Sequence, residues 1–161
     1  MWVREFEGIK FSLDIRGYNK PIKTDEEYKD DWCKVYFYVK LDKILNYLKV
    51  PSEILLSSEL DHLITKIEDL LNDRLDDVVD MSFAEPDISF TFRPKYDLRN
   101  DPNIIFLGSG SRIVDISATM HIMFWNNTYA TSNCISIYVD REDLTSLLDY
   151  LYEVVNKDVV K

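Results

Sequence analysis

The sequence is poor in the two residue types that most often bind metals and build covalent cross-links. Its 161 residues include only two cysteines, Cys33 and Cys134, and two histidines, His62 and His121. Two thiols are too few for a disulfide framework in a chain of this length, and they lack the close spacing of zinc and redox motifs. We therefore expect free thiols, no metal site and no cofactor, with Cys33 packed in the core.

Long apolar runs are also absent. Ile104–Leu107 and Ile122–Trp125 have four residues each, whereas a membrane helix needs about 20. The charged N-terminal segment Met1–Glu7 contains neither the apolar stretch nor the small-residue cleavage site of a secretory signal. We expect a protein that does not cross a membrane and that stays in the cytoplasm.

Basic residues are in the minority. Nineteen Lys and Arg stand against 29 Asp and Glu, which gives a net charge of −10. Because nucleic-acid-binding proteins meet phosphates with Lys and Arg, we expect no direct nucleic-acid partner. The same acidity would accelerate association with a basic protein in a salt-sensitive way. The alternative is that the charge only keeps the protein in solution.

Apolar material is plentiful. Hydrophobic residues make up 46% of the sequence and aromatic residues 13%, which is enough to build a core and excludes wholesale disorder. Chains split into separate domains mainly above about 250 residues. We therefore expect residues 1–161 to form one domain.

Periodic patterns predict an α+β fold. Alternating apolar residues indicate strands near residues 9–15, 32–41, 44–50, 81–93, 114–124 and 134–139, with Pro51 ending the third and Pro86 disturbing the start of the fourth. Segments 18–31 and 94–110 are predicted loops. Apolar stripes indicate helices near 58–73, capped by Ser57 or Ser58, and 141–156, capped by Asp140. We expect an antiparallel sheet of about six strands with two helices packed on one face. Strands followed by a helix occur twice, but too few residues match to establish a duplication.

Acidic residues gather after the first predicted helix. Asp73, Asp76, Asp77 and Asp80 form a run, and Glu85 and Asp87 follow close by. One interpretation is a solvated linker, and the other is a docking patch for basic residues. We predict that partner contacts include Asp76, Asp77, Asp80, Glu85 and Asp87.

Two sets of residues could in principle support catalysis. Glu85 and Asp87 would lie on one face of an extended chain, with Cα atoms about 6.6 Å apart, as in the carboxylate pairs of glycosidases. His121, on one strand face with Asp115 and Thr119, could act as a general base. Neither set comes with a visible nucleophile or a recognisable cleft, so we expect no catalytic residue and no enzyme. A hydrolase remains an alternative.

Four pieces of the sequence point to one family. They are a strand that begins with Trp32, a Leu-Leu-x-x-Glu-Leu helix start at residues 55–60, a Phe-x-Glu-Pro-x-x-x-Phe segment at residues 83–90, and a final strand and helix at residues 135–151. With them, the stretch from Trp32 to Leu151 resembles the WapI-type immunity proteins, which are small bacterial antidotes encoded next to contact-delivered toxins.

The resemblance implies a non-catalytic protein that neutralises a cognate toxin by binding it. Toxins neutralised in this way are often nucleases with basic active-site surfaces, which an acidic antidote would complement. A different interpretation is a small regulatory or scaffold domain that pairs through a sheet edge or forms a dimer.

Overall fold

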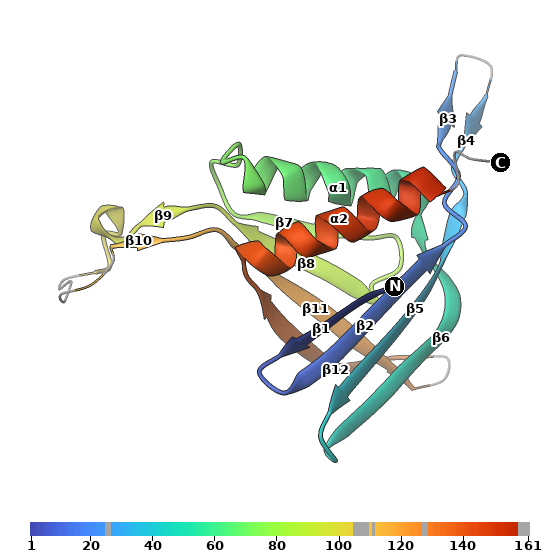
Figure 1. Ribbon diagram of the computed structural model, residues 1–161, viewed down its shortest axis with the longest axis horizontal. Helices are drawn as coiled ribbons and strands as arrows, with labels where there is room; N and C mark the ends of the chain where they lie inside the picture. The colour runs from blue at the N-terminus through green and yellow to red at the C-terminus, as the bar shows by residue number, and fades with distance from the viewer. Residues whose placement is uncertain (25–26, 105–109, 111, 127–128, 158–161) are drawn as a thin grey trace.

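Two four-stranded antiparallel sheets form most of the protein. The computed structural model describes residues 1–24, 27–104, 110, 112–126 and 129–157 (Figure 1). The first sheet contains, in spatial order, β1 (Trp2–Phe6), β2 (Ile9–Arg16), β5 (Trp32–Leu41) and β6 (Leu45–Leu56). The second contains β7 (Val79–Ser82), β8 (Ile88–Arg93), β11 (Ser117–Asn126) and β12 (Tyr129–Val139). The α+β class is confirmed, but two main sheets replace the single predicted one.

Two helices pack against each other and against both sheets (Figure 1). Helix α1 (Ser57–Leu71) follows β6 directly and contacts β6 and β8, while α2 (Arg141–Lys157) follows Asp140 and contacts β1 and β11. Both ranges confirm the predicted helices. The predicted cap of α2 is also confirmed, because the backbone N–H of Asp143 donates to the Asp140 carboxylate at 2.9 Å.

The start of α1 is stabilised differently from the prediction. The backbone N–H of Leu56 donates to the carboxylate of Glu59 at 2.8 Å, and the N–H of Ser58 donates to Asp30 at 3.0 Å. Carboxylates from inside the helix and from a distant segment therefore accept these N–H groups, in place of a Ser57 or Ser58 side chain.

Both halves of the chain repeat one order of elements: two strands, a short hairpin, two strands and a helix. The hairpins are β3 (Ile22–Lys23) with β4 (Tyr28–Lys29), and β9 (Tyr96–Asp97) with β10 (Ile113–Val114), and the 3-10 helix η1 (Leu98–Asn100) follows β9. Figure 1 shows both hairpins projecting from the body. They lie within or beside the two predicted loops, and residues 105–109 of the second loop are outside the described residues.

Four predicted strands have different limits in the structure. The strand predicted at 134–139 starts at Tyr129. The strand predicted at 81–93 is two strands, β7 and β8, joined through turn residues at 84–87 that include Pro86. Strand β6 continues past Pro51 to Leu56, because β6 is an edge strand and tolerates a residue without an N–H. The strand predicted at 114–124 starts at Ser117 and ends at Asn126.

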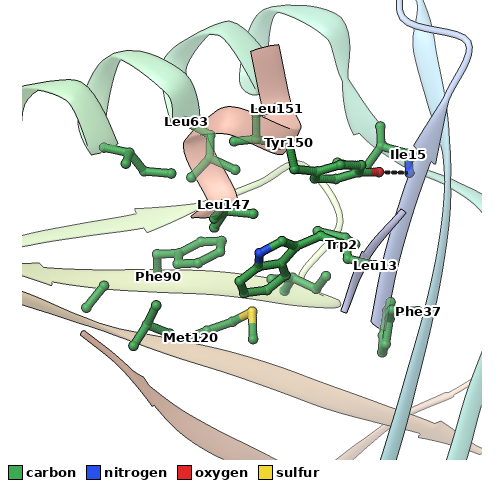
Figure 2. Close-up of a cluster of buried hydrophobic side chains, with 14 of the residues drawn as sticks. Trp2, Leu13, Ile15, Phe37, Leu63, Phe90, Met120, Leu147, Tyr150 and Leu151 are labelled. Atoms are coloured by element: carbon green, nitrogen blue, oxygen red, sulfur yellow. Dashed lines mark hydrogen bonds between the residues drawn. The ribbon is translucent and has the colours of Figure 1, made fainter. Parts of the chain in front are cut away.

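The core fills the space between the two sheets and the helices. Figure 2 shows Trp2, Leu13 and Phe37 of the first sheet on one side of this space. Opposite them lie Phe90 and Met120 of the second sheet and side chains of both helices. Cys33 is fully buried, as predicted. Because side chains from both halves share one core, neither half has a hydrophobic core of its own.

Candidate functional site

Antiparallel pairing brings four strand ends to one end of the second sheet. β7 begins at Val79, β8 ends at Arg93, β11 begins at Ser117 and β12 ends at Val139, and the register places these ends beside one another. The acidic residues just beyond these strands and beyond α1 gather here, and all are exposed. We call this group the acidic end: Asp73, Asp76, Asp77, Asp115 and Asp140.

One arginine ties part of the acidic end together. The Arg141 guanidinium donates to both oxygens of Asp115, at 2.9 and 3.0 Å, and lies 3.9 Å from Asp73. The hydrogen bond from Arg141 lowers the pKa of Asp115 to about 2. No cation among the described residues pairs with Asp76 or Asp77. The acidic end therefore keeps an uncompensated negative charge toward solvent.

Two open hollows adjoin the acidic end along the start of α2. The larger hollow has a volume of about 730 Å³, and Arg4, Arg141 and Tyr138 contribute to its lining. Four acidic residues also line it: Asp115, Asp140, Glu142 and Asp149. The smaller, of about 380 Å³, shares Tyr138 and Asp140 and adds Glu5 and Glu7. Burial, followed by the charge of Asp140, raises the pKa of Asp143 between them. Carboxylates are therefore crowded around Tyr138, whose side chain is 63% exposed.

A line of hydrogen bonds crosses the outer face of the second sheet, the face that points away from the core. Thr91 Oγ1 donates to Asp80 at 2.6 Å and so accepts from Nε2 of His121 at 3.2 Å. Nδ1 of the same imidazole is hydrogen-bonded to the Ser136 hydroxyl, at 2.9 Å. These four residues come from all four strands, so the line holds their side chains in one arrangement.

This line includes a serine–histidine pair, the core of many nucleophilic sites. Here Ser136 lines the smaller of the two hollows beside the acidic end, but His121 lines neither of them. His121 is oriented by the hydroxyl of Thr91, and Asp80 touches that hydroxyl instead of the imidazole. Neither of these hollows brings the serine and the imidazole together, so the geometry is that of an ordered polar surface.

The predicted contact residues fall into two groups. Asp76, Asp77 and Asp80 are exposed at the acidic end or next to it, and Glu85 is half-buried. Asp87 is only 1% exposed, so the exposed strand face predicted for Glu85 and Asp87 is wrong. Both residues lie in the turn between β7 and β8, where the chain is not extended.

Asp87 has a partner inside the protein. Nζ of Lys49, on β6 of the first sheet, lies 2.6 Å from Oδ1 of Asp87 and 4.9 Å from the centre of the Trp125 ring on β11. The pair joins the two sheets. Asp87 is therefore a structural residue in this fold, and its carboxylate is not available for acid–base chemistry with Glu85.

Three residues of this region were missed as contact candidates: Tyr138, Asp115 and Asp140. The sequence places Asp115 at the start of the strand predicted at 114–124 and Asp140 directly after the strand predicted at 134–139. Antiparallel pairing alone would have brought them together, because such strands start and end at the same edge. No sequence signal distinguishes Tyr138 from other tyrosines on polar strand faces.

Other kinds of site find little support. The cavity in the core is about 30 Å³ and is lined only by apolar side chains. In the described part of the chain, no three His, Cys, Asp or Glu side chains are arranged to hold a metal ion. Neither described helix is long and apolar enough to span a bilayer.

The model of the WapI-like immunity protein family matches residues 4–158, nearly the whole chain. The chain belongs to this family. The match includes residues 4–31, for which the sequence motifs offered no counterpart. No curated protein and no solved structure matches the chain. Membership in the WapI-like family implies an antidote that acts against a toxin, and immunity proteins are generally not catalytic.

Proposed function

We propose that this WapI-like protein neutralises a cognate toxin by binding a basic, nuclease-type domain of it through the acidic end. The observation that carries the proposal is the gathering of five exposed carboxylates from separate segments at one end of the second sheet. Residues 73–161 hold 15 Asp and Glu against 8 Lys and Arg, so −7 of the net charge of −10 belongs to the half that forms this sheet.

Binding alone suffices for such a mechanism. A nuclease attracts the phosphates of its substrate with basic side chains, and an acidic protein surface satisfies the same side chains. While that surface is bound, the substrate is excluded, and no residue of the antidote has to react. We expect contacts from Asp76, Asp77 and Asp80. The predicted contact residue Glu85 lies in the turn at the other end of β7, away from the acidic end, and we assign Asp87 to stability because it is buried.

The cellular location of the protein follows from the same proposal. An antidote must meet its toxin where the toxin acts, and a nuclease acts on nucleic acids in the bacterial cytoplasm. We therefore place the protein in the cytoplasm, with the toxin as its partner and without a nucleic-acid site of its own.

The experiment compares two double variants that remove the same charge. Asp76→Asn/Asp77→Asn removes two carboxylates from the acidic end, and Asp42→Asn/Glu53→Gln removes two exposed carboxylates from the first sheet and its β5–β6 turn. The readouts are the Kd for the toxin domain encoded beside this gene and rescue of cells that express it. We expect a Kd increase of roughly tenfold for the first variant and less than threefold for the second. Equal effects, or no rescue by the unmodified protein, would contradict the proposal.

A further inference from the structure

The second sheet has an outer face that nothing in the described chain packs against. Its residues form cross-strand rows: Asp80, Thr91, Thr119 and Tyr138 in one, and Ser82, Ser89, His121 and Ser136 in the next. Core residues alternate with them on every strand and point the other way. Six of these eight side chains carry a hydroxyl group, so the face offers both donors and acceptors.

We infer that this outer face is the surface that contacts the toxin, with Tyr138 as its anchoring side chain. The inference rests on the proposed function and adds to it the face and the residue. The occupant we infer is a protein domain with a basic surface, because the acidic end borders one end of the face and Asp80 lies on it. Arg93 lies on the same face, where its guanidinium donates to Thr119 at 2.7 Å.

The equivalent face of the first sheet is less suited to the same partner. There Lys10 lies directly opposite Lys40, and Arg16 lies directly opposite Lys34, on the neighbouring strands β2 and β5. Like charges in opposed positions are unfavourable within a sheet, and they would also repel a basic partner. Glu5, Asp14 and Glu53 lie among these cations, so the outer face of the first sheet is mixed in sign. The outer face of the second sheet has the same topology and carries fewer cations, with Arg93 donating to Thr119.

Tyr138 has the properties of an anchor. Its ring is 63% exposed and lies on the edge strand β12, where both hollows of carboxylates meet. No residue in the described part of the chain hydrogen-bonds its phenol group. Tyrosine is enriched among the few residues that dominate protein–protein binding energies, since it combines a large rigid apolar area with a polar tip.

The hydrogen-bond line from Ser136 to Asp80 prepares the rest of the face. Side chains that are already ordered lose little conformational freedom when a partner binds. The line holds Thr91 and His121 at the centre of the face, so a partner would meet a surface close to its bound form.

The first test uses two exposed tyrosines of similar accessibility. Tyr138→Ala is compared with Tyr28→Ala, because Tyr28 is 67% exposed on the β3–β4 hairpin of the first half. The toxin domain encoded beside this gene is titrated against each variant and against the unmodified protein by calorimetry or biolayer interferometry. We expect Tyr138→Ala to raise Kd at least tenfold, mainly through faster dissociation, and Tyr28→Ala to change it less than twofold.

A second pair of variants tests the face without relying on Tyr138. Ser136→Arg adds a positive charge to the outer face of the second sheet, and Ser12→Arg adds one to the outer face of the first. We expect Ser136→Arg to weaken binding more than thirtyfold and Ser12→Arg to leave it within threefold, with circular dichroism spectra unchanged. If the unmodified protein binds the toxin domain, and Tyr138→Ala and Ser136→Arg both bind it with the same Kd as the unmodified protein, the inferred face is wrong while the proposed function stands. If the unmodified protein does not bind, the proposed function fails and the inference fails with it.

Discussion

At the scale of single residues, Tyr150 shows how one side chain completes the hydrogen bonding of a strand. Strand β1 pairs with β2 only as far as Leu13, opposite Trp2. Beyond that point the N–H of Ile15 donates to the Tyr150 hydroxyl at 2.7 Å, as Figure 2 shows. Burial raises the pKa of Tyr150 to about 12, so the phenol stays protonated. A side chain of α2 thus replaces the missing strand neighbour.

We expect Tyr150→Phe to lower the free energy of unfolding by about 1–3 kcal/mol, because the buried N–H of Ile15 would lose its acceptor. Urea unfolding followed by circular dichroism measures the change. Tyr138→Phe is the matched control, since its phenol is exposed and has no hydrogen-bond partner among the described residues. An equal loss in both variants would contradict this role of Tyr150.

The ion pair of Asp115 predicts a pH dependence. Its folded-state pKa of about 2 lies below the ordinary 3.8, so the pair stabilises the protein above pH 3.8 and this contribution is lost as the pH falls from 3.8 to about 2. Because the side chain is 59% exposed, we expect less than about 1 kcal/mol. Asp115→Asn should thus be slightly less stable at pH 7 and equal to the unmodified protein near pH 2. Asp76→Asn should have the same stability as the unmodified protein at both pH values. If the difference in stability between Asp115→Asn and the unmodified protein grows toward low pH, the ion pair is not its cause.

Individual residues were predictable where local rules decide their role. Asp140 caps α2 and Cys33 lies in the core because capping and strand alternation are local properties. Asp87 was not predictable, since its partner Lys49 is 38 positions earlier in the sequence and on the other sheet. A carboxylate in an acidic segment gives no local sign that a distant lysine will bury it.

At the scale of elements, the pair of Lys49 and Asp87 connects strand β6 to the turn before β8. Both side chains are largely buried, with exposed fractions of 17% and 2%. Removing one partner of a buried pair leaves an uncompensated charge, which costs about 3–5 kcal/mol. We expect Lys49→Met to destabilise the protein by this amount in urea unfolding.

The double variant Lys49→Met/Asp87→Leu should recover most of that loss, because it leaves no buried charge. If Lys49→Met is as stable as the unmodified protein, the ion pair does not join the sheets. Toxin affinity of the double variant should stay unchanged, since Asp87 is assigned to the fold and not to the contact surface.

Elements with a clear period were predicted well, and those that depend on distant partners were not. Both helices and the strand at Trp32–Leu41 match their predicted limits closely. Strand β1 was missed because Arg4 interrupts the alternation of apolar residues on the side of the strand that faces the core. In the structure Nε of Arg4 lies 3.3 Å from Oδ1 of Asp143 on α2. The two short hairpins were predicted as loops, since two-residue strands are too short to show alternation.

At the scale of the whole molecule, net charge predicts the kinetics of binding. A protein of charge −10 should associate with a basic toxin domain more slowly as salt is added, because ions screen the attraction over about 10 Å at 0.1 M. We expect the association rate to fall at least tenfold between 0.02 and 0.5 M NaCl, with a smaller change in dissociation. Stopped-flow mixing measures both. An association rate independent of salt would mean that charge does not guide the encounter.

The class of the fold was predictable from the sequence, and its division into two sheets was not. Period and order of the segments establish α+β, but strands from one chain can pair into one sheet or two with the same local patterns. In the structure β6 and β7, which α1 connects, are edge strands of different sheets and do not pair with each other. The acidic end appears only after that pairing is known, because its members come from segments that are far apart in the sequence.

Residues 1–72 carry −3 of the net charge and residues 73–161 carry −7, with exposed carboxylates of the second half gathered beyond one end of its sheet. Such an uneven distribution gives the molecule an electric dipole moment in addition to its net charge. In the field of a cationic body it would experience a torque before any contact is made. Collisions would then begin with the carboxylate-bearing side in front, so a larger share of them would be productive than for a uniformly charged sphere.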